Sequence, residues 1–287
     1  MSTVPPEVPT TLLGRERPLV EDARPVVKWA GGKSRLLSQL APLLPTRMGR
    51  YHEPFLGGGA LFFHLQPLGA VVSDLNEDLV NLYHCIRDDV ESLIADLERH
   101  PYEKDYYYAM RALDPSSLSS VARASRMLYL NRTCFNGLYR VNRRGGFNVP
   151  FGRYSNPRIC NEDRLKAVSL VLADADIRHG SYAQAVEEAR AGDFVYFDPP
   201  YQPLTSTANF TSYTASDFGE QDQAELAETF ARLDRRGVRC MLSNSYTPLI
   251  CELYADFRID TVLAPRAISR TVEGRAPVLE VVVRNYT

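Results

Sequence analysis

The chain has 287 residues and a formal net charge of −2; 45% of its residues are hydrophobic and 24% are charged. These values are typical of a globular protein with one large domain or two modest ones. The sequence has no apolar run of about 18 residues, so we expect no membrane span. The first 25 residues lack the basic start and apolar core of a signal peptide. Five scattered cysteines without CxxC spacing indicate a reducing compartment and argue against a zinc site.

The first predicted elements follow a proline-rich segment over residues 1–25, which we expect to be a flexible tail. PVVKW at 25–29 predicts a strand, and a helix is expected to follow from an N-cap at Ser34. Residues 51–65 predict a turn into a glycine-rich loop and a second helix. Residues 70–86 predict a strand, an acidic residue at its end and a third helix.

The remaining elements alternate around a helical middle. In chain order they are helices within 90–133, an arginine-rich loop, a helix at 161–173, a strand end and helix at 177–190, a strand at 193–197, a helix at 217–237, and strands at 238–245 and 278–286. This pattern predicts a parallel α/β domain split by an insert. We expect the sheet domain to comprise residues 26–85 and 161–287, and the insert to comprise residues 86–160.

Charge is unevenly distributed along the insert. No Asp or Glu occurs from Pro115 to Asn161, and the stretch holds eight arginines: Arg123, Arg126, Arg132, Arg140, Arg143, Arg144, Arg153 and Arg158. A local excess of arginine suits phosphate groups and guanine edges. A solvated basic face is the plainer interpretation, but interleaved aromatic and amide side chains favour nucleic acid.

Two glycine-bearing segments are candidates for cofactor binding. AGGKS at 30–34 is not a complete phosphate loop, because Val27 stands where the first glycine is required. FLGGGALF at 55–62 precedes a helix, and Asp74 follows 17 residues after Gly57. An acid there is placed to accept hydrogen bonds from ribose hydroxyls, although a helix N-cap is the alternative. Because neither segment contains a complete phosphate-binding motif, the glycine-rich loop and Asp74 together favour a nucleoside cofactor such as S-adenosylmethionine over a dinucleotide.

The segment FDPPYQP at 197–203 stops a buried strand with an acid, two prolines and an aromatic residue. The prolines stiffen the backbone just past the strand end, where ligands bind in open α/β sheets. Asp198 and the Pro199 carbonyl are two acceptors for the amino group of a base, and Tyr201 is placed to stack on its face. The base must leave the duplex to enter such a pocket. Catalysis would then rest on positioning and electrostatics, without a metal or a cysteine nucleophile.

Six segments together resemble the Dam-type, or D12 class, DNA adenine-N6 methyltransferases from about residue 26 to the end of the chain. They are KWAGGK at 28–33, PFLGGGALFF at 54–63, SDLNEDL at 73–79, NRTCFNGLYRVNRRGGFNVPFGRY at 131–154, FDPPY at 197–201 and TANFTSY at 207–213. The resemblance implies a Rossmann-like S-adenosylmethionine-dependent methyltransferase sheet with an inserted, mostly helical DNA-recognition domain. It also implies methyl transfer to N6 of a flipped adenine in duplex DNA, within GATC, and no metal.

Roles at the matching positions are implied in the same way. The catalytic residues would be Asp198, Pro199, Pro200 and Tyr201. The cofactor would contact Trp29, Ala30, Gly31, Lys33, Phe55, Gly57, Gly58, Gly59, Asp74 and Asp198. DNA would contact Lys28, Phe135, Asn136, Leu138, Arg140, Asn142, Pro150, Arg153 and Tyr154.

Within the DNA set, the resemblance implies that Arg140 reads a guanine and that Leu138 touches the thymine methyl group. Phe135 and Asn136 would wedge into the stack; relatives often have Tyr where this chain has Phe135. NFTSY at 209–213 is hypothesised to be a lid that orders on DNA.

The expected partner is double-stranded DNA containing GATC, with the protein monomeric, not bound to a membrane, and cytoplasmic in a bacterial nucleoid or encoded by a phage. Two alternatives stay open: an N4-cytosine or RNA base methyltransferase, and a catalytically inactive DNA-binding protein on the same fold. Repair marking, replication control, phage protection and restriction-modification all fit the sequence.

Overall fold

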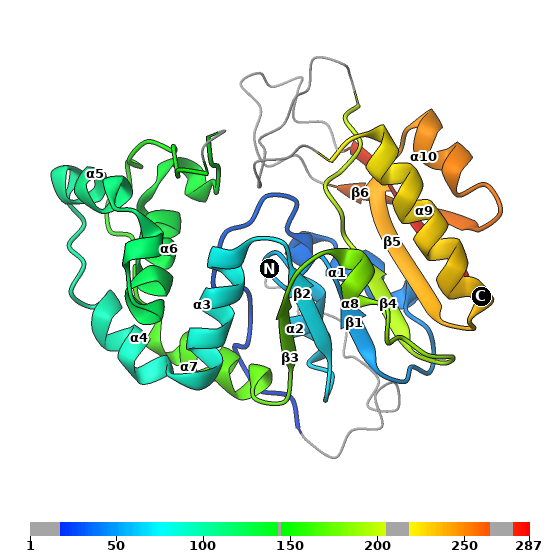
Figure 1. The fold of residues 1–287 in the computed structure, drawn as a ribbon, viewed down its shortest axis with the longest axis horizontal. Coiled ribbons are helices and arrows are strands. Elements are labelled where there is room, and N and C mark those ends of the chain that lie inside the picture. Colours follow the sequence, from blue (N-terminus) through cyan, green and yellow to red (C-terminus); the bar gives the residue numbers. More distant parts are fainter. Residues whose placement is uncertain (1–17, 143–144, 205–217, 265–277) are drawn as a thin grey trace.

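A seven-stranded sheet occupies the centre of the computed structural model, which describes residues 18–142, 145–204, 218–264 and 278–287 (Figure 1). The strand order is β3-β2-β1-β4-β5-β7-β6. The strands are β1 (Tyr51–Glu53), β2 (Val71–Asp74), β3 (Asp176–His179), β4 (Phe194–Phe197), β5 (Arg239–Ser245), β6 (Arg258–Ala264) and β7 (Val278–Arg284). Strands β1 to β5 pair in parallel, whereas β7 runs antiparallel to both β5 and β6.

The described helices connect and flank these strands. They are α1 (Leu37–Leu40), α2 (Ala60–Leu65), α3 (Glu77–Asp88), α4 (Val90–Leu97), α5 (Lys104–Ala112), α6 (Ser120–Thr133), α7 (Glu162–Leu172), α8 (Tyr182–Ala185), α9 (Glu220–Arg235) and α10 (Pro248–Leu253). Short 3-10 turns occur at η2 (Lys33–Arg35), η3 (Ala41–Leu43), η4 (Pro115–Ser117) and η5 (Phe135–Gly137).

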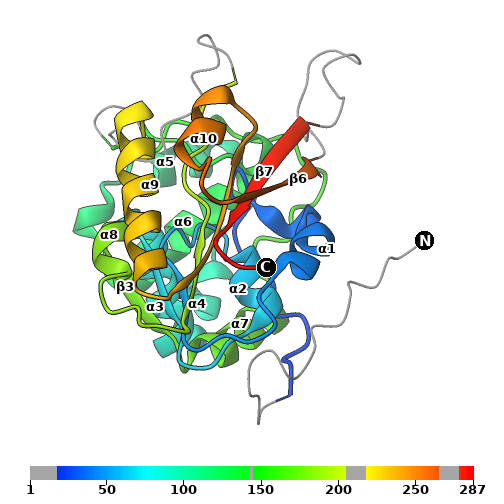
Figure 2. The same cartoon turned by 90° about the vertical axis from the view of Figure 1, so that its right-hand side faces the viewer.

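Side-chain alternation along β4 divides the core into two layers. Phe194 and Tyr196 pack into the cluster that includes α2, α3, α6 and α7, while Val195 and Phe197 pack against α9 and α10. Successive side chains of a strand point to opposite faces, so a central strand needs apolar residues at every position. The two groups of helices lie apart in Figure 1, and Figure 2 shows α9 and α10 from their own side.

The helices α4, α5 and α6 gather at one end of the sheet, beyond β3 (Figure 1). There α6 packs on α3, α4 and α5, and α7 packs on α3 and α4. A small aromatic core around Tyr107 and Tyr129 joins α5 and α6 to the segment that follows them. The helical middle of the chain thus has apolar contacts of its own; that residues 86–160 form an insert stays a prediction.

The strand predicted at 25–29 is wrong, because this segment is irregular. Val26 and Val27 are buried, but the main-chain N–H and C=O of Lys28 pair with the side chain of Asn131 instead of a neighbouring strand. Apolar content alone therefore misled the prediction.

Other predicted elements also differ from the structure. The helix expected from Ser34 is broken into η2, α1 and η3; Pro42 lies inside η3, and proline removes a helical donor. Strand β1 was predicted as a turn, since its three residues are polar or aromatic, yet all three are buried. Strand β6 and helix α10 were not predicted, whereas the other strands and long helices occur where they were predicted.

Candidate active site

The candidate site lies where the strand order reverses direction, between the neighbouring parallel strands β1 and β4. The chain leaves β1 into the glycine loop before α2 and leaves β4 into the DPPY segment. Carboxyl ends of parallel strands meet at one edge, and the reversal point of an open α/β sheet is its preferred ligand crevice. The fold therefore brings together two segments about 140 residues apart in the sequence.

Asp198 is held by an ion pair with Lys33. The Lys33 ammonium lies 2.6 Å from one carboxylate oxygen and 2.8 Å from the other, and it also donates to the carbonyl of Gly31. The side chain of Lys33 is only 4% exposed, and that of Asp198 is 19% exposed. Burial raises the pKa of Asp198 to about 6, Lys33 lowers it and Glu280 raises it. The carboxylate is thus ionised at neutral pH, with lone pairs left to accept further hydrogen bonds.

Tyr201 is fixed from two sides. Its hydroxyl donates to Glu280 on β7 at 2.8 Å, and the Lys33 ammonium lies 4.6 Å from its ring centroid. A cation over an aromatic face and a hydrogen bond at the ring edge together leave the ring little freedom. Glu280 was not predicted; it is 79 residues from Tyr201 and follows a segment without a recognisable motif.

The main chain of the DPPY segment is held by two fully buried amide side chains. Gln223 of α9 donates to the carbonyl of Pro200 at 2.9 Å and accepts from Asn244 of β5 at 3.0 Å. Asn244 in turn accepts from the main-chain N–H of Gln202 at 3.0 Å. Among the described residues, no hydrogen bond engages the carbonyl of Pro199. That oxygen is therefore the main-chain acceptor that remains beside Asp198.

A second acid lies at the end of β1. Glu53 is buried and accepts a hydrogen bond from Tyr51 at 2.6 Å. Burial, together with the nearby Asp198 charge, raises the pKa of Glu53 to about 8 against the lowering effect of this hydrogen bond. Glu53 is therefore mostly protonated at neutral pH, so Asp198 carries the negative charge of this pair of carboxyl groups. Sequence analysis missed Glu53, because it lies in the strand that was read as a turn.

The glycine loop is shaped by Asp74 and Trp29. Asp74 accepts from the N–H of Gly57 at 2.9 Å, and Tyr83 donates to the Gly57 carbonyl at 2.8 Å. Gly57 has φ of 47°, and a Cβ there would lie 2.7 Å from the Trp29 ring. Only glycine fits this close approach. The structure therefore brings Trp29, Gly57 and Asp74 together, and their contact with a cofactor stays a prediction.

The other residues of the predicted cofactor set surround this loop less tightly. Ala30 and Gly31 are exposed before η2, and Gly58 lies against Trp29. Gly59 precedes α2 with φ of 66°, and Phe55 packs on Tyr182 at 5.3 Å between ring centroids.

Four predicted DNA contacts lie close together in space, beside the C-terminal end of α6. The Lys28 ammonium lies 4.9 Å from the Tyr154 ring centroid and 3.5 Å from its hydroxyl. The N–H of Phe135 donates to the carbonyl of Pro150 at 2.8 Å, and the Phe135 side chain is 50% exposed. An exposed aromatic ring of this size is suited to contact a partner.

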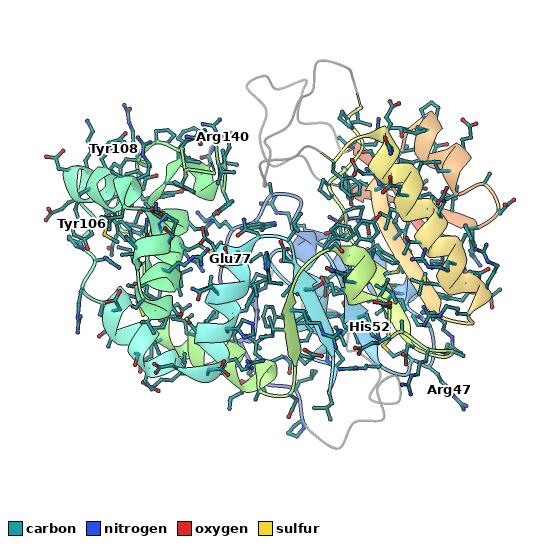
Figure 3. All side chains as sticks on the ribbon, in the orientation of Figure 1. Arg47, His52, Glu77, Tyr106, Tyr108 and Arg140 are labelled. Atoms are coloured by element: carbon teal, nitrogen blue, oxygen red, sulfur yellow. The ribbon has the colours of Figure 1, made fainter. Side chains whose placement is uncertain are left out.

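The remaining predicted DNA contacts lie on or beside a hairpin, in which residues 140–142 pair with residues 146–148. Arg140 donates to Asn148 across it at 2.6 Å, and Asn142 accepts from the N–H of Gly146. Figure 3 shows Arg140 on the helical side of the molecule. Asn136 has a left-handed φ of 57° and is exposed, as is Arg153, whereas Leu138 is half-buried.

The predicted arginine-rich surface is corrected by the structure. Arg123 pairs with two carboxylates of α3, Arg126 is buried and donates to two carbonyls of α5, and Arg132 donates to the carbonyl of Val26. Arg158 lies 3.6 Å from a carboxylate of α7. These partners all lie outside the stretch from Pro115 to Asn161, so counting charges within one segment overstated the basic face.

Two predictions fall outside the described residues. They are the lid at 209–213 and any contact by Arg143 or Arg144, and most of the tail at 1–25 also lies there.

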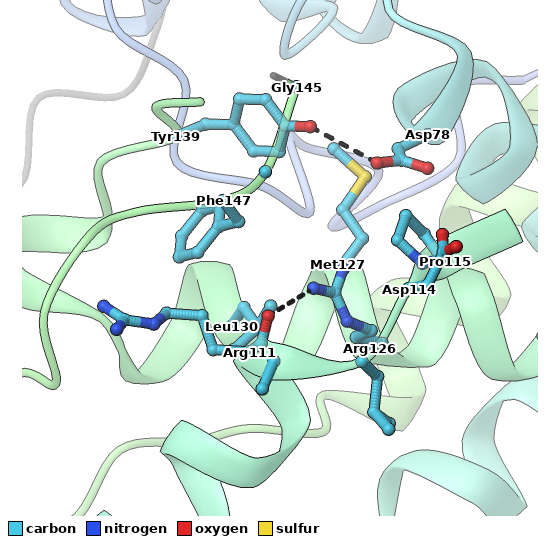
Figure 4. Close-up of a pocket in the computed structure, with 13 residues that line it drawn as sticks. Asp78, Arg111, Asp114, Pro115, Arg126, Met127, Leu130, Tyr139, Gly145 and Phe147 are labelled. Carbon is cyan, nitrogen blue, oxygen red and sulfur yellow. Dashed lines mark hydrogen bonds between the residues drawn. The ribbon is translucent and has the colours of Figure 1, made fainter. Parts of the chain in front are cut away.

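A cavity of about 380 Å³ is lined by residues of α5 and α6 and by Tyr139 (Figure 4). Its lining includes Asp78, Arg126, Met127 and Phe147. Asp78 accepts from Tyr139 at 3.4 Å, and Tyr139 stacks on Trp29 with 4.9 Å between ring centroids. The cavity is thus separated from the glycine loop by stacked rings.

Comparison with known proteins gives the family. A family model described as D12 class N6 adenine-specific DNA methyltransferase matches residues 29–268. The chain belongs to this family. The enzymes of this family use S-adenosylmethionine, and the predicted Rossmann-like methyltransferase fold is confirmed. The family match favours adenine N6 over the cytosine and RNA alternatives, and an enzyme over an inactive binding protein.

Three relatives illustrate the range of the family. The chain is 45% identical to the type II methyltransferase M1.LlaDCHI of Lactococcus lactis subsp. cremoris, over 92% of this chain and 95% of the relative. It is 41% identical to the type II methyltransferase M.MjaIII of Methanocaldococcus jannaschii, over 92% and 100%. It is 37% identical to the DNA adenine methylase of Escherichia coli (strain K12), over 86% and 89%.

Two structural features are absent from the described ranges. None of the helices in them has the length and apolarity needed to cross a bilayer. Those ranges also hold no group of three or more His, Cys, Asp or Glu side chains arranged to bind a metal ion.

Proposed function

We propose that this DNA adenine methyltransferase acts on the adenine of GATC, after that base has left the duplex and entered the site at the end of β4. The observation that carries the proposal is the buried arrangement of Lys33, Asp198 and Tyr201 beside the glycine loop. It presents an ionised acceptor, a free main-chain carbonyl and a fixed aromatic ring at one strand end. A planar base with an exocyclic amino group is the ligand that uses all three.

The adenine amino group needs help to act as a nucleophile, because its lone pair is delocalised into the ring. Asp198 and the Pro199 carbonyl accept its two N–H groups, which draws the nitrogen toward tetrahedral geometry. Tyr201 stacks on the base and fixes its angle. Asp198 then takes up the proton that N6 releases when the new N–C bond forms. Each contribution is positioning or electrostatics, which need no covalent intermediate with the protein.

The glycine loop fits an adenosine-type cofactor. Gly57 brings main chain against Trp29 with no room for a side chain, and the partly exposed Asp74 supplies acceptor oxygens for hydroxyl groups. S-adenosylmethionine, when bound there, supplies the methyl group from its sulfonium. The exposed side chain of Leu75, next to Asp74, adds an apolar surface for the purine ring.

Recognition of GATC is assigned to the hairpin and the residues before it. Arg140 is held by Asn148, so its guanidinium is oriented before DNA arrives and suits the bidentate contact to a guanine. Leu138 faces the thymine methyl group. Phe135 and Asn136 fill the gap that the adenine leaves in the stack, and Lys28, Asn142, Pro150, Arg153 and Tyr154 contact the outer part of the site and its backbone.

The test is methyl transfer from labelled S-adenosylmethionine to two duplexes, one with a single GATC and one with those four bases scrambled. Label as N6-methyladenine in the GATC duplex alone is the expected result. Label in both duplexes would refute GATC recognition while leaving adenine methylation in place. A duplex with 2-aminopurine at the target position adds a direct measurement, since an unstacked 2-aminopurine becomes more fluorescent when the base leaves the helix.

Arg140→Ala is expected to lower discrimination at one guanine by about 1–3 kcal/mol, roughly 5- to 150-fold in kcat/KM, because one bidentate base contact is lost. The measurement compares kcat/KM on GATC and on duplexes with that guanine replaced. Arg158→Ala is the control, since Arg158 is exposed beside Asp163 and has no assigned base contact. An unchanged ratio of kcat/KM values in Arg140→Ala would remove this residue from the recognition set.

A further inference from the structure

One buried side chain links the cofactor loop to the DNA-reading segment. Asn131, near the end of α6, is fully buried. Its carbonyl oxygen accepts from the main-chain N–H of Lys28 at 2.8 Å, and its amide nitrogen donates to the Lys28 carbonyl at 2.8 Å. The same nitrogen donates to the carbonyl of Gly137 at 3.2 Å. One amide side chain therefore links the main chain of Lys28, 103 positions away in the sequence, to Gly137 in the loop that precedes the hairpin.

Lys28 and Trp29 face different ligands. The Lys28 ammonium points to Tyr154 among the predicted DNA contacts, whereas Trp29 lies against Gly57 of the glycine loop. Asn131 pairs with the peptide groups on both sides of the Lys28 Cα, so it fixes the main chain from which these two side chains diverge. A rotation of the peptide between Lys28 and Trp29 would change the direction of one side chain relative to the other.

Two further contacts make the connection stiff. The Lys28 stem packs so closely on Gly137 that a Cβ there would lie 2.2 Å from the Lys28 Cδ. Trp29 stacks on Tyr139, the residue before Arg140. Hydrogen bonds of a fully buried amide cannot be replaced by bulk water, so displacing Gly137 or Lys28 leaves unpaired polar groups.

We propose that Asn131 is a positioning residue that couples cofactor binding to DNA binding. The inference rests on the proposed function, because it takes the glycine loop as the cofactor site and residues 135–154 as the DNA site. When DNA fixes the 135–140 loop, Gly137 and Asn131 fix the Lys28 peptide and hence Trp29 against Gly57. Thermodynamic linkage makes the effect reciprocal, so cofactor tightens DNA binding by the same factor.

The test measures the dissociation constant of S-adenosylhomocysteine, which cannot react, for the free protein and for the protein saturated with a GATC duplex. The ratio of the two constants is the coupling factor, and couplings between sites typically span about 5- to 150-fold. We expect the wild-type factor to lie in that range and the Asn131→Ala factor to fall close to one. The reciprocal measurement, duplex affinity with and without S-adenosylhomocysteine, must give the same factor.

Asn285→Ala is the matched control. Its side chain also accepts one hydrogen bond, from the N–H of Cys240, and donates two, to Asp234 and the carbonyl of Val238, but at the amino end of β5. It loses the same number of bonds without touching either site, so its coupling factor should stay at the wild-type value even if its melting temperature drops. Asn131→Asp covers the case in which Asn131→Ala does not fold, since it keeps the shape and one acceptor but loses both donors.

The outcomes separate the two proposals. Wild-type protein that binds neither S-adenosylhomocysteine nor the duplex would overturn the proposed function and the coupling together. Binding of both ligands with a wild-type factor of one would overturn the coupling alone. The coupling would also be overturned if the folded Asn131 variants kept the wild-type coupling factor, or if Asn285→Ala lost that factor to the same extent.

Discussion

Asp198→Ala is expected to lower kcat for methyl transfer by at least about 10²- to 10³-fold, the usual cost of removing one preorganised electrostatic contact at a reacting centre. The substitution removes both the acceptor for the amino group and the base for its proton. The measurement is single-turnover methylation of a GATC duplex, with duplex affinity measured separately by fluorescence anisotropy. DNA affinity should change little, because the predicted DNA contacts lie on other segments.

The control for this variant is Asp193→Ala, at the opposite end of β4. Asp193 accepts from the main-chain N–H groups of Arg50 and Arg190, so its loss removes comparable hydrogen bonds from the same strand. Its kcat should stay near wild type. Wild-type turnover in Asp198→Ala, or an equal loss in Asp193→Ala, would contradict the role assigned to Asp198.

Lys33→Met is expected to have the second largest effect, on both pH dependence and stability. Lys33 lowers the pKa of Asp198, which is about 6 in the wild type. Without the ammonium that pKa rises, and catalysis requires the ionised carboxylate. The acid limb of kcat against pH, expected near 6 in the wild type, should therefore move to higher pH. Glu280→Gln should move it the opposite way, because the Glu280 charge raises this pKa and Gln still accepts from Tyr201.

The stability of Lys33→Met follows from the same pair. Removing one partner of a buried ion pair typically costs about 3–5 kcal/mol, and the 19% exposure of Asp198 places this pair toward the lower end. The pKa of Asp198 is higher in the folded protein than in the unfolded chain. The ionised carboxylate therefore destabilises the folded state, and this cost develops as pH rises through the folded pKa. The deficit in unfolding free energy should thus be larger at pH 8 than at pH 5. Denaturant titrations at both pH values measure it.

Lys166→Met is the matched control for stability. Lys166 also lies close to two carboxylates, Glu91 and Glu162, but on the solvent-exposed side of α7. Exposed pairs contribute little, so this variant should unfold like the wild type at both pH values. A Lys33→Met protein with an unshifted acid limb and wild-type unfolding would show that the ion pair has no role in tuning Asp198.

Local patterns in the sequence were enough to predict the strand before Asp198, the long helices and the candidate catalytic acid. The run FVYF at 194–197 is apolar at every position, which suits a strand covered on both faces, and two prolines mark its end. The helices α3 and α6 begin after side-chain caps, and buried positions of α3 and α9 recur at helical spacing; such signals are encoded within a dozen or so residues. The motifs then supplied the family and the expected cofactor.

Such local patterns do not predict short or polar strands at the centre of a sheet. The buried residues of β1 include His52 and Glu53, which read as surface residues in isolation. Their burial follows from the pairing of β1 with β2 and β4, and no local signal predicts it. The segment at 25–29 shows the reverse error, since apolar side chains there pack in the core without entering the sheet.

Three motifs are each written in consecutive residues: a DPPY acid, a glycine loop and an arginine-bearing segment that we propose reads DNA. Which groups surround these motifs depends on the folded chain. Lys33 meets Asp198 across 165 positions, Asn131 meets Lys28 across 103, and Arg123 pairs with a carboxylate of α3. Local propensity acts within a few residues, whereas charge pairing and burial depend on neighbours that only the folded chain brings together.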